Sequence, residues 1–141
     1  MALGVHDVEG EKQAPSAELL ERIHRAKTGA LLRFACVAGG ILAQAKPVER
    51  EALEQFGSLV GQAFQIADDI LDVESDAATL GKAAGKDAGA GKGTLVSLYG
   101  LAKSKERLTS LVADAEKSLA PFGAKASVLI EAARFIAERK S

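Results

Sequence analysis

The sequence predicts an all-α protein, and three observations lead to this fold class. Apolar residues recur at helical spacing along most of its 141 residues. No stretch shows sustained period-two alternation of β-branched residues, so strands are not expected. The prolines Pro15, Pro47 and Pro121 all fall between the apolar patterns, where helices begin or end. With 48% hydrophobic residues, the chain has enough apolar surface for one domain over residues 1–141.

The first predicted helix begins at Pro15 and Ser16, after a polar lead-in, and runs to about residue 38. Gly39 and Gly40 follow and weaken it, because glycine is a poor helix former. The helical spacing of this stretch is set by Leu19, Leu20, Ile23, Ala26, Ala30, Leu31, Phe34 and Ala38.

The second predicted helix opens at Pro47, whose fixed φ and missing donor suit a first turn, and it runs from about residue 48 to 73. Its apolar residues cover most of its circumference, which is expected of a helix enclosed by other helices. They are Phe56, Leu59, Val60, Ala63, Phe64, Ile66, Ala67, Ile70, Leu71 and Val73.

Residues 74–93 change in composition to Gly, Ala, Lys and Asp, and they predict a loop rich in glycine and lysine with at most a helical turn in it. Two further helices are predicted over about residues 102–119 and 124–139. Pro121 and Gly123 separate these two helices.

Charge and composition exclude several classes of function. Lysine plus arginine (18) nearly balance aspartate plus glutamate (19), so the net charge of −1 gives no reason to expect nucleic acid or an anionic membrane as a partner. Glycine, glutamine or charged residues break every apolar stretch well before the ~20 residues that a membrane span requires. The single cysteine, Cys36, cannot form an intrachain disulfide, and the sequence opens without a secretory core. We therefore expect a cytoplasmic protein.

Three aspartates, Asp68, Asp69 and Asp72, stand near the end of the most apolar predicted helix. Asp68 and Asp72 are four residues apart and share a face, and Asp69 lies about 100° around the helix. Like charges at this spacing destabilise a helix by about 0.2–0.5 kcal/mol per pair, and burying a carboxylate without a partner costs far more. The cluster therefore predicts a bound cation.

The face of the aspartates continues backward through Gln65, Gly61 and Gly57, a polar or side-chain-free stripe that we expect to line a cavity. Oxygen ligands suit hard cations, and Mg²⁺ is commonly bound by one or two carboxylates, waters and a substrate phosphate. Zinc is disfavoured, because the two histidines and the single cysteine are scattered along the chain. The predicted cation is therefore Mg²⁺.

The residues around the aspartates identify a family resemblance. Phe64, Gln65, two further residues and the aspartates form the pattern Phe-Gln-x-x-Asp-Asp-x-x-Asp, which resembles the second aspartate-rich motif of trans-type polyprenyl diphosphate synthases. Without these flanking residues, the aspartates would be interpreted as a solvated helix end. Lys27, Thr28 and Gly29 are similar to the family's lysine-threonine contact to diphosphate. The family's loop after the second motif is similar to Gly81, Lys82, Gly85, Lys86, Asp87 and Lys92.

The resemblance extends from about residue 16 to the end of the chain and implies the carboxyl-terminal half of an isoprenoid-synthase-type helical bundle. Family members hold Mg²⁺ between two aspartate clusters and condense an allylic diphosphate, dimethylallyl or geranyl diphosphate, with isopentenyl diphosphate. The metals and lysines neutralise the leaving diphosphate, so that the C–O bond breaks to an allylic cation. The resemblance thus implies a transferase of isoprenoid biosynthesis of the farnesyl or geranylgeranyl diphosphate synthase kind.

By match to the family, Asp68 and Asp72 bind one metal ion, and Asp69 supports them through water or hydrogen bonds. Lys27, Asp68 and Asp72 are the implied catalytic residues. The residues implied to hold the allylic diphosphate are Lys27, Thr28, Gln65, Lys82 and Lys92.

Two other interpretations of the motifs are disfavoured. Residues 89–94 are similar to the phosphate loop of a nucleotide kinase, but that loop needs a glycine where Lys86 stands, and no apolar strand precedes it. A terpene cyclase of the same architecture usually has Asn, Ser or Thr and Glu in place of the trailing aspartates, so Asp69 and Asp72 argue against it.

No Asp-Asp-x-x-Asp or Asp-Asp-x-x-x-x-Asp pattern precedes Asp68, although family members carry their first aspartate-rich motif in helices before this region. The chain therefore resembles half an enzyme, and we expect it to be inactive alone. The alternative is a non-catalytic helical partner that complements another prenyltransferase subunit. Because the most apolar helix lacks neighbours to cover it, we expect pairing with the missing amino-terminal helices or a homo-oligomer such as a dimer.

Overall fold

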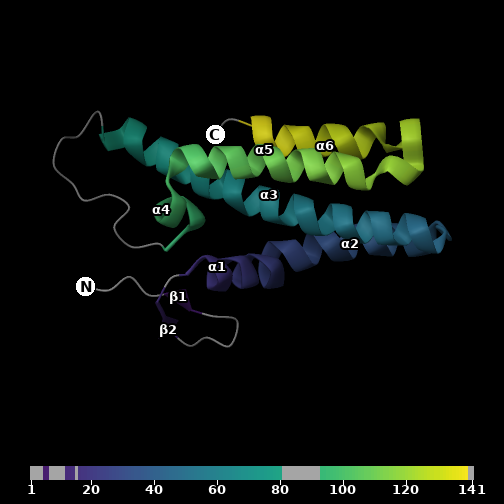
Figure 1. Ribbon diagram of the computed structural model, residues 1–141, viewed down its shortest axis with the longest axis horizontal. Coiled ribbons are helices and arrows are strands. Elements are labelled where there is room, and N and C mark those ends of the chain that lie inside the picture. The colour runs from purple at the N-terminus through teal and green to yellow at the C-terminus, as the bar shows by residue number, and fades with distance from the viewer. Residues whose placement is uncertain (1–4, 7–11, 15, 81–92, 140–141) are drawn as a thin grey trace.

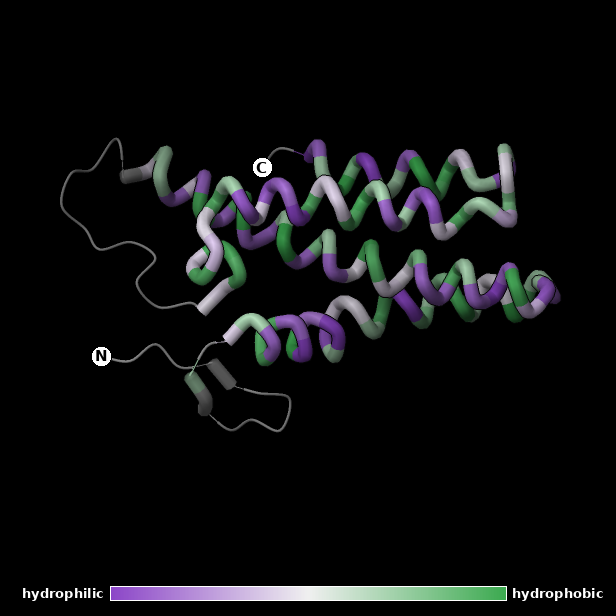
Figure 2. The backbone as a smooth tube through the Cα atoms, in the orientation of Figure 1, coloured by the Kyte–Doolittle hydropathy of each residue, from purple (hydrophilic) through white to green (hydrophobic). Residues whose placement is uncertain are grey.

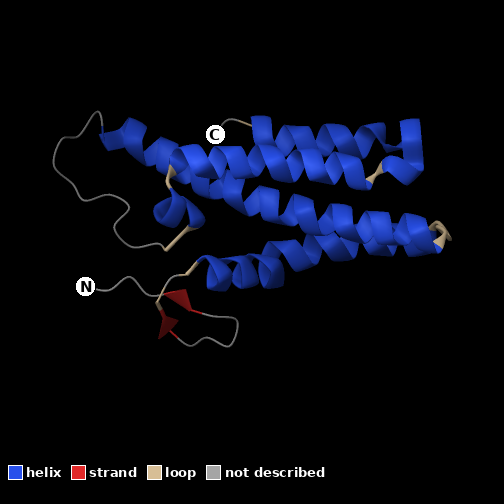
Figure 3. Ribbon diagram, viewed as in Figure 1, coloured by secondary structure: helices blue, strands red, loops and turns tan. Residues whose placement is uncertain are grey.

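A computed structural model of the chain describes residues 5–6, 12–14, 16–80 and 93–139. Within these ranges the body of the molecule consists of helices, drawn in blue in Figure 3, so the all-α prediction is confirmed. Two short strands, β1 (Val5–His6) and β2 (Lys12–Gln13), pair antiparallel near the amino terminus. They were not expected, because strands of two residues are too short to produce a period-two pattern.

The first predicted helix is divided into three segments. They are α1 (Ala17–His24), a π-helical turn η1 (Arg25–Gly29) and α2 (Ala30–Leu42). Ser16 caps the start of α1, because its side chain accepts a hydrogen bond of 3.2 Å from the backbone N–H of Leu19. The start of this helix is therefore where the sequence predicts it, and the π-helical turn in its middle is a feature that periodicity does not reveal.

Gly39 and Gly40 do not end the helix, since α2 continues through both. Gly40 packs against α3 (Pro47–Leu80), and a Cβ added at Gly40 would lie 2.8 Å from the Cδ1 atom of Leu53. Contact between the two helices thus outweighs the low helix propensity of glycine.

The helix α3 extends beyond its predicted end. The loop predicted over residues 74–93 is wrong for residues 74–80, which are helical, and residues 81–92 lie outside the described ranges. Residues 74–80 contain no glycine or proline, and an ion pair of 2.5 Å joins Glu74 to Lys105. The apolar pattern stops at residue 73 because the helix becomes exposed there, not because it ends.

The carboxyl-terminal part consists of α4 (Leu95–Tyr99), α5 (Leu101–Ser118), a 3₁₀ segment η2 (Ala120–Ala126) and α6 (Ser127–Glu138). The last two predicted helices correspond to α5 and α6 and are confirmed. The short α4 was not predicted, because five residues are too few for a periodic pattern. Gly100 separates α4 from α5 with a φ of +85°, which favours glycine.

The helix α3 runs through the middle of the molecule, with α2 along one side and α5 and α6 along the other (Figure 1). Hydrophobic and hydrophilic residues are interspersed along the long helices α3, α5 and α6, as expected of amphipathic helices (Figure 2). No helix in the described ranges combines the length and apolar content needed to cross a membrane. The core joins α3 to its neighbours and includes Leu20, Leu53, Phe56, Val60, Ala63, Ile66, Ile70, Leu95, Leu108, Leu111, Ala115, Leu119 and Ala133.

Candidate functional site

The carboxyl-terminal half of α3 places the three aspartates at the edge of the core. Ala67, directly before the aspartates, and Ile70, between Asp69 and Asp72, are buried. Asp68 and Asp69 are half-buried, and Asp72 is exposed. The carboxylates therefore lie at the boundary between packed apolar side chains and solvent.

Asp68 has a cationic partner from the far end of the chain. The Nη2 group of Arg139 donates a hydrogen bond to Oδ1 of Asp68 and forms an ion pair with it. The same guanidinium lies over the ring of Phe64, with Cζ 4.4 Å from the ring centroid. Arg139 thus contacts α3 both at the aspartate cluster and one turn before it.

Asp69 faces α1. Its Oδ2 atom lies 4.0 Å from Nε2 of His24, and both side chains are largely buried. Burial, and after it the positive charge of Lys27, lower the pKa of His24, while Glu21 acts in the opposite direction. His24 therefore connects α1 to the aspartate cluster, three residues before Lys27.

Lys27 and Thr28 lie in the π-helical turn η1, where the helix is kinked. Lys27 has non-helical backbone angles (φ −91°, ψ −113°) and is exposed, whereas Thr28 is half-buried. Gly29 is required beside them, because a Cβ there would lie 2.8 Å from the carbonyl oxygen of His24. Lys27 therefore lies at an exposed kink three residues after His24.

The two glycines of the stripe, Gly61 and Gly57, pack against neighbouring backbone and do not line a cavity, contrary to the sequence-based expectation. A Cβ at Gly61 would lie 2.6 Å from the Cα atom of Gly29, and a Cβ at Gly57 would lie 2.7 Å from the Cα atom of Arg33. Both glycines are buried where η1 and α2 cross α3, and only Gln65 remains half-buried. Because glycine has no side chain, it permits close contact between backbones. In the sequence, a glycine at such a contact looks the same as a glycine that lines a cavity.

The loop lysines predicted to bind diphosphate, Lys82 and Lys92, lie outside the described residues, as does Lys86. The described part of the site therefore comprises the aspartates, Gln65 and the Lys27-Thr28 turn.

The three aspartates are not by themselves a complete set of metal ligands. Within the described ranges, no three His, Cys, Asp or Glu side chains come together as metal ligands. Asp68 and Asp72 are one helical turn apart and offer carboxylate oxygens, the donors that Mg²⁺ prefers. Since Mg²⁺ takes only one or two carboxylates from a protein when water and phosphate oxygens supply the rest, this donor set fits Mg²⁺ bound together with a diphosphate.

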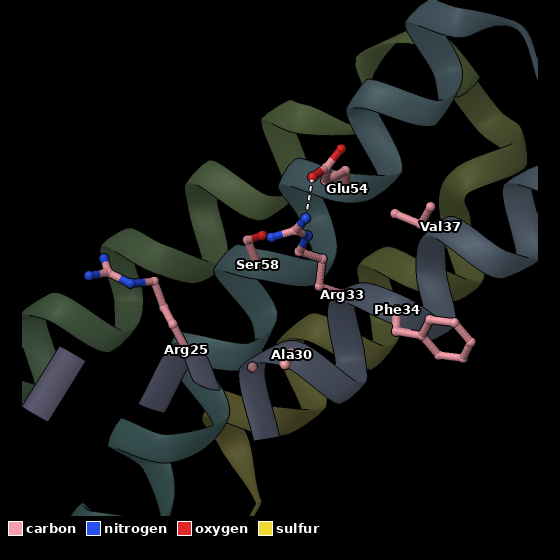
Figure 4. Close-up of a pocket in the computed structure, with 8 residues that line it drawn as sticks. Arg25, Ala30, Arg33, Phe34, Val37, Glu54 and Ser58 are labelled. Atoms are coloured by element: carbon pink, nitrogen blue, oxygen red, sulfur yellow. Dashed lines mark ion pairs between the residues drawn. The ribbon is translucent and has the colours of Figure 1, made fainter. Parts of the chain in front are cut away.

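A cavity of about 450 Å³ opens between α2 and α3, and none of the three aspartates lines it. Figure 4 shows Arg33 extending to Glu54 beside Ser58, with Phe34 and Val37 on the other side of Arg33. Arg33 and Glu54 form an ion pair of 2.9 Å. This ion pair forms part of the cavity lining, and Arg25 and Gly29 of η1, the segment that also carries Lys27 and Thr28, line the cavity as well.

Sequence reasoning missed two residues that contact the cluster, His24 and Arg139. His24 is three residues before Lys27, so the conspicuous Lys-Thr-Gly turn could have directed attention to it. No local signal marks Arg139, because it lies 71 residues away from Asp68 along the chain.

The chain is similar to known proteins over most of its length. The model of the family described as Polyprenyl synthetase matches residues 4–124. The chain is 41% identical over 136 residues to a farnesyl diphosphate synthase from Micrococcus luteus, covering 94% of this chain and 46% of that protein. It is 45% identical over 125 residues to a chloroplastic geranylgeranyl pyrophosphate synthase from Capsicum annuum, covering 88% of this chain and 34% of that protein.

Among solved structures, an apo FPP/GFPP synthase from Zymomonas mobilis is similar in fold, with a TM-score of 0.73 and 34% sequence identity. The similarity covers 88% of this chain and 40% of that chain. The chain therefore spans less than half the length of the curated relatives described here.

Proposed function

Because this chain belongs to the polyprenyl synthetase family, we propose that it supplies the carboxyl-terminal half of a prenyltransferase active site in isoprenoid biosynthesis. The proposed reaction is the Mg²⁺-dependent condensation of dimethylallyl or geranyl diphosphate with isopentenyl diphosphate. In this proposal residues 1–141 form one helical unit of the enzyme, and Lys82 and Lys92 of the glycine- and lysine-rich segment belong to its active site. Similarity to relatives named as farnesyl and geranylgeranyl diphosphate synthases supports the reaction class.

The observation that carries this proposal is the meeting of two motifs that are far apart in the sequence. The turn with Lys27 and Thr28 belongs to η1, and the aspartates belong to α3. The backbones touch at Gly29 and Gly61, and His24 lies 4.0 Å from Asp69. A cationic donor and a carboxylate cluster on adjacent segments suit a magnesium diphosphate.

The protein's own residues have distinct parts in the proposed reaction. Asp68 and Asp72 bind the divalent cation, and Asp69 orients that ligand set through water or a hydrogen bond. When bound, Mg²⁺ supplies positive charge that stabilises the departing diphosphate. The Lys27 ammonium group donates hydrogen bonds to phosphate oxygens and adds charge as the C–O bond breaks. The remaining proposed contacts to the diphosphate come from Thr28, Gln65, Lys82 and Lys92.

The outer face of α2 supports the proposal that further helices complete the enzyme. Phe34 is 69% exposed and Leu42 is 84% exposed, although both are large and apolar. Apolar surface of this kind marks a site of interaction with other protein. We propose that the amino-terminal helices of a complete polyprenyl synthetase fold cover this outer α2 face, and that the chain has no turnover without them. The face comprises Leu31, Phe34, Ile41 and Leu42, with Val48 at the start of α3.

The decisive test measures prenyl transfer by the protein made from its complete gene. We expect labelled isopentenyl diphosphate to be condensed with dimethylallyl or geranyl diphosphate only when Mg²⁺ is present. The variant Asp72→Asn should lower kcat by about 10²-fold or more, because it removes a carboxylate that binds the charge-stabilising cation. The control Asp114→Asn changes an exposed aspartate of α5 that pairs with Lys117, and it should leave kcat unchanged. Equal rates for the two variants would contradict the assignment.

The exposed outer α2 face also favours a second candidate function, that of a non-catalytic helical subunit. In that case the purified protein would show no prenyl transfer alone but would raise the rate of a separate prenyltransferase chain when the two are mixed. For either function we propose a cytoplasmic location, since a chain with one cysteine, Cys36, has no intrachain disulfide to form.

A further inference from the structure

The end of α6 is joined to the aspartate cluster by a single arginine. Arg139 directly follows α6, and its backbone N–H donates a hydrogen bond of 2.9 Å to the carbonyl oxygen of Phe135. Its side chain reaches α3, where Nη2 donates to Asp68 and Cζ lies 4.4 Å from the Phe64 ring centroid. Phe64 and Asp68 are one turn apart, so one guanidinium covers a full turn of α3.

The surroundings of Arg139 make Asp68 its essential counter-charge. The Arg139 side chain is only 22% exposed, and its Nε atom is buried without a hydrogen-bond partner in the described part of the chain. A guanidinium that has lost most of its hydration needs an anion, and the pair formed with Asp68 supplies it. The aromatic face of Phe64 adds attraction but no negative charge.

The same carboxylate is the proposed ligand of a divalent cation. With Oδ1 of Asp68 already hydrogen-bonded to Arg139, a cation at Asp68 would stand close to a second positive charge. We propose that Arg139 competes with the divalent cation for Asp68, so that cation binding releases the arginine and loosens the end of α6. This inference rests on the proposed function, because it assumes that Asp68 binds a cation.

The molecule has room for this exchange. A cavity of about 280 Å³ lies beside Arg139, between α3, α5 and α6, and both Leu71 and Glu74 line it. The released guanidinium can move into this space, where the carboxylate of Glu74, already paired with Lys105, can take Arg139 as a second partner. In the absence of a cation, the Arg139 contact offsets the repulsion among the neighbouring aspartates of α3.

The test measures Mg²⁺ binding in the presence of inorganic pyrophosphate, by titration calorimetry on the protein made from its complete gene. If the two cations compete, Arg139→Gln should bind Mg²⁺ at least about 5-fold more tightly than the wild type, the lower limit of typical couplings between sites. A residue that only stabilises the fold would instead weaken binding when removed. Arg139→Lys keeps the positive charge, so its affinity for Mg²⁺ should rise less than that of Arg139→Gln. An equal rise in affinity for the two variants would overturn the proposal.

A second readout follows the end of α6 directly. Addition of Mg²⁺ and pyrophosphate to the wild type should raise the amide hydrogen exchange rate of Arg139, whose N–H is bonded to Phe135. Unchanged or slower exchange would overturn the release of the helix end.

The matched control is Arg134→Gln, which removes the arginine that lies within α6 itself. Arg134 donates two hydrogen bonds of 2.7 Å to Glu116, away from Asp68, so its loss should leave Mg²⁺ affinity unchanged. In an Asp68→Asn background, Arg139→Gln should no longer increase the affinity. If the wild type binds Mg²⁺ and Arg139→Gln binds it equally well, only the competition fails. If the wild type binds no Mg²⁺ with pyrophosphate, the proposed function fails as well.

Discussion

Single glycines decide how closely the two halves of the candidate site approach. Gly61 on α3 lies against Gly29 of η1, and a Cβ at Gly61 would be 2.6 Å from the Cα atom of Gly29. That distance is too short for any real Cβ contact, and the opposing group is backbone, which cannot rotate away. By contrast, a Cβ added at Gly39 of α2 would meet nothing within 4 Å. Identical residues thus have opposite roles in the two places.

We predict that Gly61→Ala and Gly39→Ala change stability in opposite directions. Gly61→Ala should lower the free energy of unfolding by about 1–3 kcal/mol, because the backbones of η1 and α3 must separate. Gly39→Ala should raise it by about 0.5–1 kcal/mol, because alanine favours an exposed helix interior. Urea denaturation followed by circular dichroism measures both changes. Destabilisation of equal size by the two substitutions would show that the close contact at Gly61 is not important.

At the scale of helices, the pairing of α5 with α6 places Arg139 over the aspartates. Ala115 on α5 and Ala133 on α6 are both fully buried, which allows the two helices to pack closely. Arg134 and Glu116 join the same helices with a bidentate ion pair on the exposed side. The position of α6 along α5 therefore determines where its last residues contact α3.

The Arg134–Glu116 pair predicts a specific pH dependence of stability. The hydrogen bonds from Arg134 lower the pKa of Glu116 below its ordinary value of 4.5. A carboxyl group with a lowered pKa in the folded state stabilises that state above its unfolded pKa, and this stabilisation is lost as the pH falls through the lower, folded pKa. The melting temperature of Arg134→Gln should thus lie slightly below that of the wild type at neutral pH, and the two should converge in acid. The effect is small because the pair is exposed.

Thermal melts across this pH range provide the measurement, and Glu116→Gln combined with Arg134→Gln provides the control. The double variant should be no less stable than Arg134→Gln alone, because the interaction has already been removed. A difference in melting temperature that persists unchanged in acid would be inconsistent with the pair as its source.

For the molecule as a whole, the outer α2 face is the main apolar surface that no other described helix covers. α3 is covered on one side by α5 and α6 and on another by α2, but α2 has its own apolar residues exposed to solvent (Figure 1). A helix with apolar residues on two sides is stable in water only when a further layer of protein covers the second side. The 141-residue chain therefore has the surface of one layer of a larger helical assembly.

We predict that the isolated 141-residue chain associates with itself through the outer α2 face. Replacing both Phe34 and Leu42 with glutamine should shift the chain toward the monomer in sedimentation velocity experiments. The control is Val128→Gln, because Val128 is 73% exposed on α6, away from α2, and its replacement should not change association. A wild-type monomer at micromolar concentration with a cooperative melt would contradict the prediction.

The helices were predictable because the apolar residues on the buried face of a helix recur every three or four positions in the sequence. This local pattern predicted α5 and α6 and the start of α1, and it failed at residues 74–80, where an exposed helix carries no apolar pattern. It also failed at α4, which is too short to show a period.

The sequence alone determined the all-α class and, through the aspartate pattern and its flanking residues, the family to which the chain belongs. The fold class and the family could both be inferred because each depends on residues that are close together along the chain. Only the tertiary structure showed that Gly61 permits helix contact instead of lining a cavity, and that Arg139 is the partner of Asp68. These features depend on contacts between residues far apart in the chain, and such contacts leave no periodic signal because they arise only when separate helices pack together.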